Sequence, residues 1–188
     1  MSNSTAAAIL TTPDLDEALR VVRGLLGVAD LDCAEVDFEA EIQSRQGLAE
    51  VSRVLPGLNW WAREESDPRS AKAGDDPAEC LPVRVHDWCH ALQLAEPFVR
   101  ALGPRDAAAV RWDLNGWPAV PEAGLEDISQ KYAYLTLSVN SRDLYQCELA
   151  PDHTVYVHVR GEHDLDRVHW LAAQVGGRFE GRTELAPL

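Results

Sequence analysis

The sequence predicts an α+β fold in which about four helices pack on a largely antiparallel sheet, because strand and helix patterns come in blocks. Apolar and acidic residues alternate over 34–42, which is typical of a half-buried strand. Three short strand patterns follow one another at 133–139, 144–149 and 154–160, and predict a C-terminal three-strand antiparallel meander. Residues 178–184 are expected to return as an edge strand.

Helical spacing of apolar residues supports each expected helix. The first begins at Asp14, because Asp14 and Glu17 have the spacing of a capping box, and it ends near Gly27. Residues 46–55 predict a second, short helix, and the apolar positions of 165–175 predict the last one. Residues 1–11 show neither the helical spacing of apolar residues nor the alternation of a strand, and we expect a loose N-terminal tail there.

A further helix is predicted from about Arg84 to Leu102, where an apolar stripe recurs at helical spacing. Pro97 lacks an N–H, so we expect it to kink or divide this helix. Asn115 and Gly116 separate two apolar runs and predict a hairpin turn.

The length of 188 residues predicts a single domain over 1–188, since domains typically hold about 100–200 residues. Residues 65–79, before Arg84, are polar and contain two prolines and a glycine. We therefore expect a long polar surface loop over 62–82, and loops of that length are often functional.

The charge is strongly acidic, with 31 Asp and Glu against 17 Lys and Arg and a net charge of −14. Such a protein is repelled by phosphate backbones and by anionic membrane surfaces, so neither nucleic acid nor membrane is an expected partner. Residues 1–50 carry ten acidic and three basic residues, an excess that general solubility does not require.

The acidic side chains of 34–42 are the first candidate site. Glu35, Asp37, Glu39 and Glu41 would stand in a row on one face of the strand, about 6.6 Å apart. Such a row can dock a basic protein, or it can be the solvated outer face of an edge strand that blocks aggregation. Trp60 and Trp61 are candidate anchors for the same partner, although each can equally be buried.

A second candidate site lies in the helix predicted from Arg84. His86, Cys89 and His90 have i, i+3 and i+4 spacing and would project from one helix face, with Cys80 in the loop just before them. Imidazole and thiolate are zinc ligands, so this constellation predicts a zinc site. In the alternative interpretation the two histidines flank the core and Cys89 packs as a small apolar residue.

The four cysteines are sparse and form no CxxC pair, and no apolar run approaches the ~18–20 residues of a membrane helix. The N-terminus also lacks the pattern of a signal peptide, so we expect a cytoplasmic protein with reduced thiols. No P-loop, GxSxG or dinucleotide-binding pattern is present in the sequence, and an enzyme is therefore not indicated.

Together these observations predict an acidic interaction protein that binds and restrains a basic protein, as an immunity protein or antitoxin does. It would need no cofactor. The alternative is a small metal-dependent enzyme or zinc-stabilised domain that uses His86, Cys89 and His90. A third hypothesis is a ligand pocket on the C-terminal sheet with Tyr156 and His158 as polar groups. The sequence leaves the identity of the partner and the oligomeric state open.

Overall fold

The computed structural model describes residues 3–62, 76–129, 132–146, 148–161 and 164–187. An eight-stranded sheet contains segments from both ends of the chain, and all neighbouring strands in it are antiparallel. Its order is β10 (Thr183–Pro187), β1 (Asn3–Thr12), β9 (His153–Val159), β8 (Tyr134–Val139), β5 (Ala107–Asp113), β2 (Glu35–Ile42), β4 (Val83–His90) and β3 (Trp60–Ala62).

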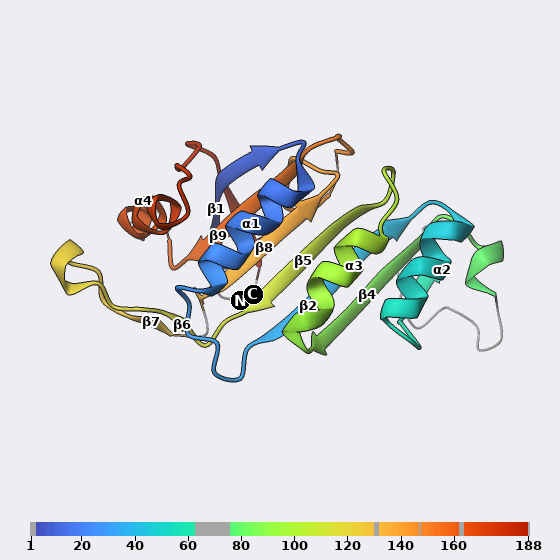
Figure 1. Cartoon of the computed structure of the whole chain (residues 1–188), viewed down its shortest axis with the longest axis horizontal. Coiled ribbons are helices and arrows are strands. Elements are labelled where there is room, and N and C mark those ends of the chain that lie inside the picture. The colour runs from blue at the N-terminus through green and yellow to red at the C-terminus, as the bar shows by residue number, and fades with distance from the viewer. Residues whose placement is uncertain (1–2, 63–75, 130–131, 147, 162–163, 188) are drawn as a thin grey trace.

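Four α-helices accompany this sheet, and the predicted α+β class is confirmed. They are α1 (Leu15–Leu26), α2 (Arg45–Val54), α3 (Ala95–Ala101) and α4 (Leu165–Gln174). Figure 1 shows α1, α2 and α3 lying over the same face of the sheet. We call this the helix-covered face, and the opposite one the open face. No described helix combines the length and the hydrophobicity that crossing a bilayer requires.

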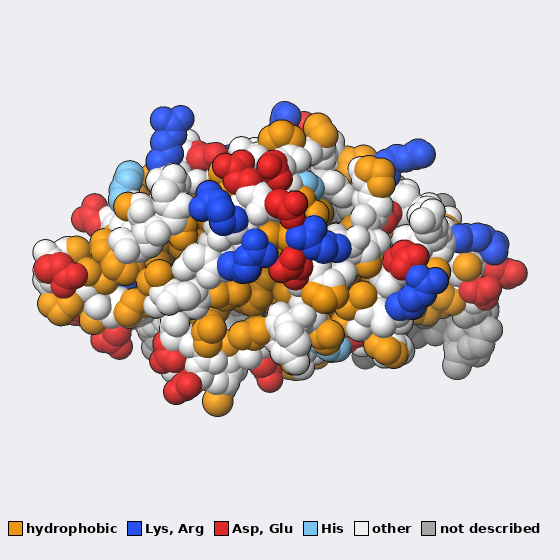
Figure 2. Space-filling model, viewed as in Figure 1, with side chains coloured by type: hydrophobic (Ala, Val, Ile, Leu, Met, Phe, Trp, Pro, Cys, Tyr) orange, Lys and Arg blue, Asp and Glu red, His pale blue; other side chains and the backbone are white. Residues whose placement is uncertain are grey.

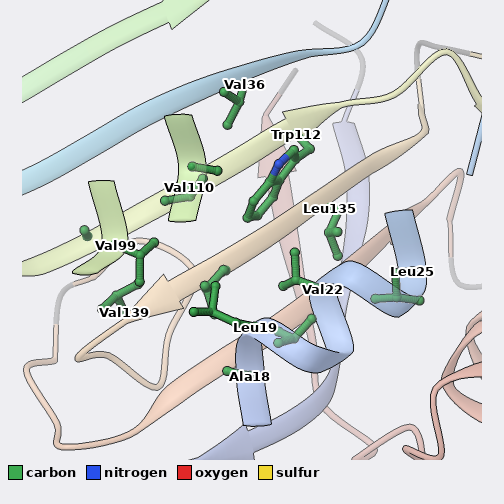
Figure 3. Packing of buried hydrophobic residues seen from close by; sticks show 14 of the residues in the cluster. Ala18, Leu19, Val22, Leu25, Val36, Val99, Val110, Trp112, Leu135 and Val139 are labelled. Atoms are coloured by element: carbon green, nitrogen blue, oxygen red, sulfur yellow. The ribbon is translucent and has the colours of Figure 1, made fainter. Parts of the chain in front are cut away.

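The core lies between the helices and the sheet. Leu19, Val22 and Leu25 of α1 point toward Trp112 of β5 and Leu135 of β8 (Figure 3), and all five side chains are at most 3 % exposed. Helix α1 begins as predicted, because the Asp14 carboxylate accepts hydrogen bonds from the backbone N–H groups of the first turn. Each fully buried side chain of this size contributes about 1.5–3 kcal/mol relative to an exposed one.

The N-terminal tail predicted for residues 1–11 is wrong, because residues 3–12 form strand β1. This strand pairs with β9 on one side and β10 on the other. Its alanines are buried on both faces: Ala7 packs toward the helices, while Ala6 and Ala8 pack against Leu144 on the open face. A strand that is covered on both faces does not alternate between apolar and polar residues, so the sequence pattern did not predict this strand.

The helix predicted from Arg84 is also wrong in its first part, because residues 83–90 form strand β4. Val83 and Val85 are buried on the helix-covered face, whereas Arg84 is exposed. A β-bulge follows, since Val36 pairs with His90 while Phe38 pairs with Asp87. The extra residue shifts the side-chain period, so that strand and bulge together imitate helical spacing.

Only the second part of that segment is helical. Pro97 neither kinks nor divides α3 but is the third residue of this helix. Backbone N–H groups in the first turn have no intrahelical acceptor, so the missing N–H of proline leaves no bond unmade there.

Two predicted hairpins are absent from the described residues. Gly116 belongs to β6 (Gly116–Trp117), which pairs with β7 (Ile128–Ser129) rather than with β5. A side chain at Gly116 would meet the carbonyl oxygen of Ile128 at 2.6 Å, so this close pairing requires glycine. The described residues of 144–149, which were predicted as a strand, lie instead in the loop that links β8 to β9. The structure describes this loop over 140–146 and 148–152, and we call it the 140–152 loop.

Two other segments differ in detail from expectation. The edge strand predicted for 178–184 is β10, which begins five residues later and does lie at an edge of the sheet. Residues 63–75 of the predicted polar loop lie outside the described residues. In its last part, Pro77–Glu79 form a short 3-10 helix.

Arg167 connects α4 to the β6–β7 region from a position that is only 1 % exposed. Its guanidinium donates hydrogen bonds to the carbonyl oxygens of Pro118 and Glu126. We expect Arg167→Leu to lower the free energy of unfolding by about 2–4 kcal/mol, because two partly buried carbonyl groups lose their donor. Urea denaturation followed by circular dichroism measures this change.

The matched control is Arg178→Leu, at an exposed position for which no ion pair is found within the described residues. We expect this variant to remain within about 0.5 kcal/mol of the unmodified protein. Equal stability of the two variants would contradict a structural role for Arg167.

Candidate binding site on the open sheet face

A cavity of about 170 Å³ lies on the open face of the sheet. Six strands contribute to its lining, namely β2, β4, β5, β8, β9 and β10, and residues 144–146 of the 140–152 loop form one wall. Its polar lining comes from side chains far apart in the sequence: Asp37, Glu39, His86, Arg111, Tyr134, Thr136, Tyr145, Gln146 and His158.

The open face is concave at this cavity. Strands β4 and β10 are six strand intervals apart in the sheet order. In a flat sheet that separation would be about 29 Å. His86 of β4 and Ala186 of β10 nevertheless line the same small cavity, so the sheet curves around it.

The 140–152 loop is anchored to the sheet at several points. Leu144 is buried among Ala6, Ala8, Tyr156 and Ala186. The hydroxyl of Tyr145 donates a hydrogen bond to the carbonyl oxygen of Leu185. These contacts hold residues 144–146 over the open face, so the wall that they form belongs to the fold.

Arg111 of β5 is the central cation of the site. Its Nη2 donates to Asp37 Oδ2 at 2.7 Å, and its Nε donates to Asp113 Oδ1 at 2.9 Å. The guanidinium carbon also lies 5.3 Å from the centre of the Tyr134 ring. Burial lowers the pKa of Arg111, but the carboxylates of Asp113 and Asp37 outweigh it and raise the pKa overall. Arg111 is therefore a fixed positive charge between two carboxylates.

The acidic row has the predicted orientation. Val36, Phe38, Ala40 and Ile42 are buried in the core, so the intervening acidic side chains all point to the open face. Glu35 and Glu39 are exposed, and Glu41 is half-buried with its carboxylate 3.7 Å from Arg84. Strand β2 lies between β5 and β4, so the interpretation of this row as the protection of an edge strand is wrong.

The neighbouring strands neutralise this row only in part, because Asp37 pairs with Arg111 and Glu41 lies within ion-pair distance of Arg84. Across β4, β2 and β5, the outward positions carry five carboxylates, of Glu35, Asp37, Glu39, Glu41 and Asp113, but only the guanidinium groups of Arg84 and Arg111. Burial comes first among the causes that raise the pKa of Asp113, and the carboxylate of Asp37 adds to it, although Arg111 opposes both. The centre of the open face thus keeps an excess of negative charge.

The charges on the helix-covered face are balanced by contrast. Arg23 pairs with Glu96 at 3.0 Å, and Arg100 pairs with Asp16 at 2.7 Å and with Glu96 at 2.9 Å. Figure 2 shows acidic and basic side chains side by side over the centre of this face. The hydrogen bond from Arg100 is the main reason that the pKa of Glu96 is lowered.

The two predicted tryptophan anchors are not prominent on the surface. Trp60 is half-buried and packs against the core, and Trp61 is only 9 % exposed. Trp88, by contrast, lies on β4 and is 53 % exposed. Its ring lies 4.9 Å from that of His86, so the exposed tryptophan next to the cavity is Trp88.

The predicted convergence of His86, Cys89 and His90 on one helix face is wrong, because these residues lie on strand β4 and its bulge. His86 lines the open face, whereas the ring of His90 packs 5.5 Å from that of Phe38 in the core and lies 3.2 Å from Asp87. Cys80 follows the 3-10 helix at 77–79 and packs against the core. Within the described ranges, no three His, Cys, Asp or Glu side chains are grouped to hold a metal ion.

Cys89 has a different role in the local structure. It adopts a left-handed backbone conformation with φ 63° at the bulge, and its N–H donates to Asp37 Oδ1 at 2.9 Å. A hydrogen bond to Glu35, together with burial and the nearby carboxylates, raises the pKa of the thiol. Cys89 is therefore a protonated thiol at neutral pH, and this form is a poor nucleophile.

His158 lies buried at the base of the cavity. In the sequence, only its position on one face of a predicted strand indicated that it could belong to a site. Nδ1 lies 3.0 Å from the Ser4 hydroxyl, and Nε2 lies 2.9 Å from the Thr136 hydroxyl. Burial, with a smaller effect of Arg111, lowers the pKa of His158 to about 3. The imidazole is thus a neutral hydrogen-bonding group and not a second cation.

No protein family matches the chain, and no curated protein or solved structure is similar to it at a significant level.

The pKa of His158 predicts how stability varies with pH. Between about pH 3 and 6.5 the unfolded chain protonates this histidine and the folded protein does not, so acid favours unfolding. We expect the free energy of unfolding to fall by about 1.4 kcal/mol per pH unit from this residue alone as the pH decreases from 6 to 4.

Urea denaturation at several pH values measures this slope in the unmodified protein and in His158→Gln. Between pH 4 and 6, the free energy of unfolding of the glutamine variant should change with pH less steeply, by the contribution of about one proton. This difference in slope does not depend on how stable the variant is at pH 7. Parallel slopes for the two proteins would show that His158 is protonated in the folded state.

Proposed function

We propose that this protein binds a basic protein partner on the open face of its sheet, with the β2 carboxylates at the centre of the interface. The observation that carries the proposal is the excess of negative charge over β4, β2 and β5 on that face, where five carboxylates meet two guanidinium groups. Opposite charge on a partner accelerates its association and penalises partners of like charge.

The shape of the open face supports the same function. A concave sheet surrounds a convex part of a partner more closely than a flat one. Trp88, 53 % exposed beside His86, supplies the kind of aromatic side chain that often anchors an interface. The helix-covered face offers no comparable charge, because its acidic and basic groups pair with one another.

The specific form of this function that we infer is an inhibitor of the immunity-protein or antitoxin type, acting in the cytoplasm. An enzyme that acts on a polyanion needs a basic cleft, and an acidic concave surface is complementary to such a cleft. Binding there would restrain the enzyme by competition with its substrate. No grouping of metal ligands in the described part of the chain favours the alternative of a zinc-dependent enzyme.

A charge-reversal experiment tests the docking surface. Glu35→Lys and Glu39→Lys are combined in one variant, since both side chains are exposed. The control combines Glu122→Lys and Glu126→Lys, which make the same charge change at exposed positions near the turn at one end of the molecule (Figure 1). Proteins captured from the native host by each tagged form are identified by mass spectrometry.

We expect a basic protein that the unmodified form and the control capture but the β2 variant does not. With that protein purified, the β2 variant should reduce the association rate at low salt by at least about tenfold and flatten its salt dependence. Capture of the same proteins by all three forms would contradict docking on this face.

A further inference from the structure

We propose that the cavity on the open face holds one arginine side chain of the basic partner, with Glu39 as its counter-ion. This inference depends on the proposed docking function and specifies the central contact of that interface.

The cavity keeps a net negative charge. Arg111 is engaged by both Asp37 and Asp113, so these three groups together carry one negative charge. Glu39 adds a second carboxylate to the lining, and no ion pair to it is found within the ranges that the structure describes. A cation that enters the cavity therefore meets a carboxylate that no guanidinium group of the described residues neutralises.

The space next to Glu39 has room for one side chain. Its cross-strand neighbour on β5 is Ala109, whose small side chain leaves the surface hollow at that point. On the other side Glu39 pairs with His86 of β4. The resulting volume of about 170 Å³ is below the several hundred Å³ of typical pockets for drug-sized ligands or cofactors. It suits a group of the size of one side chain.

Aromatic rings also line the cavity. Tyr145 stands in its wall, fixed by the hydrogen bond from its hydroxyl to Leu185, and Tyr134 lies on β8. Guanidinium groups bind favourably over aromatic rings. The contact of Arg111 with Tyr134 at 5.3 Å shows that the same surface already binds a guanidinium group in this way.

The position of the cavity suits a central contact. It lies against β2 and β5, in the interior of the sheet and within the acidic row. Arginine is among the residues that most often dominate binding energy when they enter a pocket near the centre of an interface.

The test uses N-acetyl-L-arginine amide as the probe and its citrulline analogue as a control that is similar in shape but uncharged. Binding to the full chain is measured by NMR titration at pH 8 and low salt, where a histidine of ordinary pKa is neutral. We expect the arginine compound to bind in roughly the millimolar range and citrulline about tenfold more weakly. The amide shifts should concentrate in β2, β5 and residues 144–146.

Two conservative variants locate the counter-ion. Glu39→Gln should weaken arginine binding about fivefold, whereas Glu35→Gln, in the same row but outside the cavity lining, should change it less than about twofold. Circular dichroism confirms that both variants are folded. Equal binding of citrulline, equal effects of the two variants, or shifts spread over the whole acidic surface would each overturn the assignment.

The outcome separates the cavity from the docking surface. A partner that is lost with the Glu35 and Glu39 charge reversals, together with failure of the arginine test, would overturn the cavity assignment alone. Specific binding of the arginine compound, with no partner that depends on the open face, would overturn the assignment of that arginine to a protein.

Discussion

The arrangement of the site depends on one constraint, which is that helices cover only one face of the sheet. Because successive side chains of a strand point to opposite faces, every residue that β2 sends into the core places an acidic neighbour on the open face. A shift of the strand by one residue would bury four carboxylates, at a cost that no single domain could compensate. The hydrophobic core therefore fixes the orientation of the acidic row.

Arg111 reduces the repulsion between carboxylates that lie on adjacent strands in the interior of the sheet. Carboxylates on adjacent strands repel one another, and Asp37 and Asp113 occupy neighbouring strands. One guanidinium between them removes most of that repulsion, and the cavity is left with the single additional carboxylate of Glu39. The protein thus combines an internally paired cluster, which stabilises the face, with exposed carboxylates, which are available to a partner.

The sequence predicted those features that depend on a local period. The alternation over 34–42 identified β2 and its outward row, and the capping pattern at Asp14 identified the start of α1. Strand β1 was missed because it is covered on both faces, and β4 was missed because a bulge shifts its period. The grouping of His86 with Cys89 and His90 failed for the same reason, since it assumed the period of a helix.

The cavity could not have been predicted, because its lining comes from segments that only the full topology brings together. His86 and His158 are separated by more than seventy residues in the sequence, and neither spacing nor composition relates them. Tyr145 reaches the cavity from a segment that had been expected to form a strand. The cavity forms because the sheet curves over several strands, and no local sequence motif encodes it.

The same curvature explains how a small acidic surface can be selective. On a flat sheet, exposed carboxylates would attract any basic protein, and each exposed ion pair would contribute at most about 1 kcal/mol. Here Asp37 is fixed by Arg111 and by the backbone N–H of Cys89, and the 140–152 loop is anchored through Tyr145. A binding surface that is already ordered loses little entropy when a partner arrives. Because its walls are fixed, the cavity favours a partner whose basic side chain matches it in position as well as in charge.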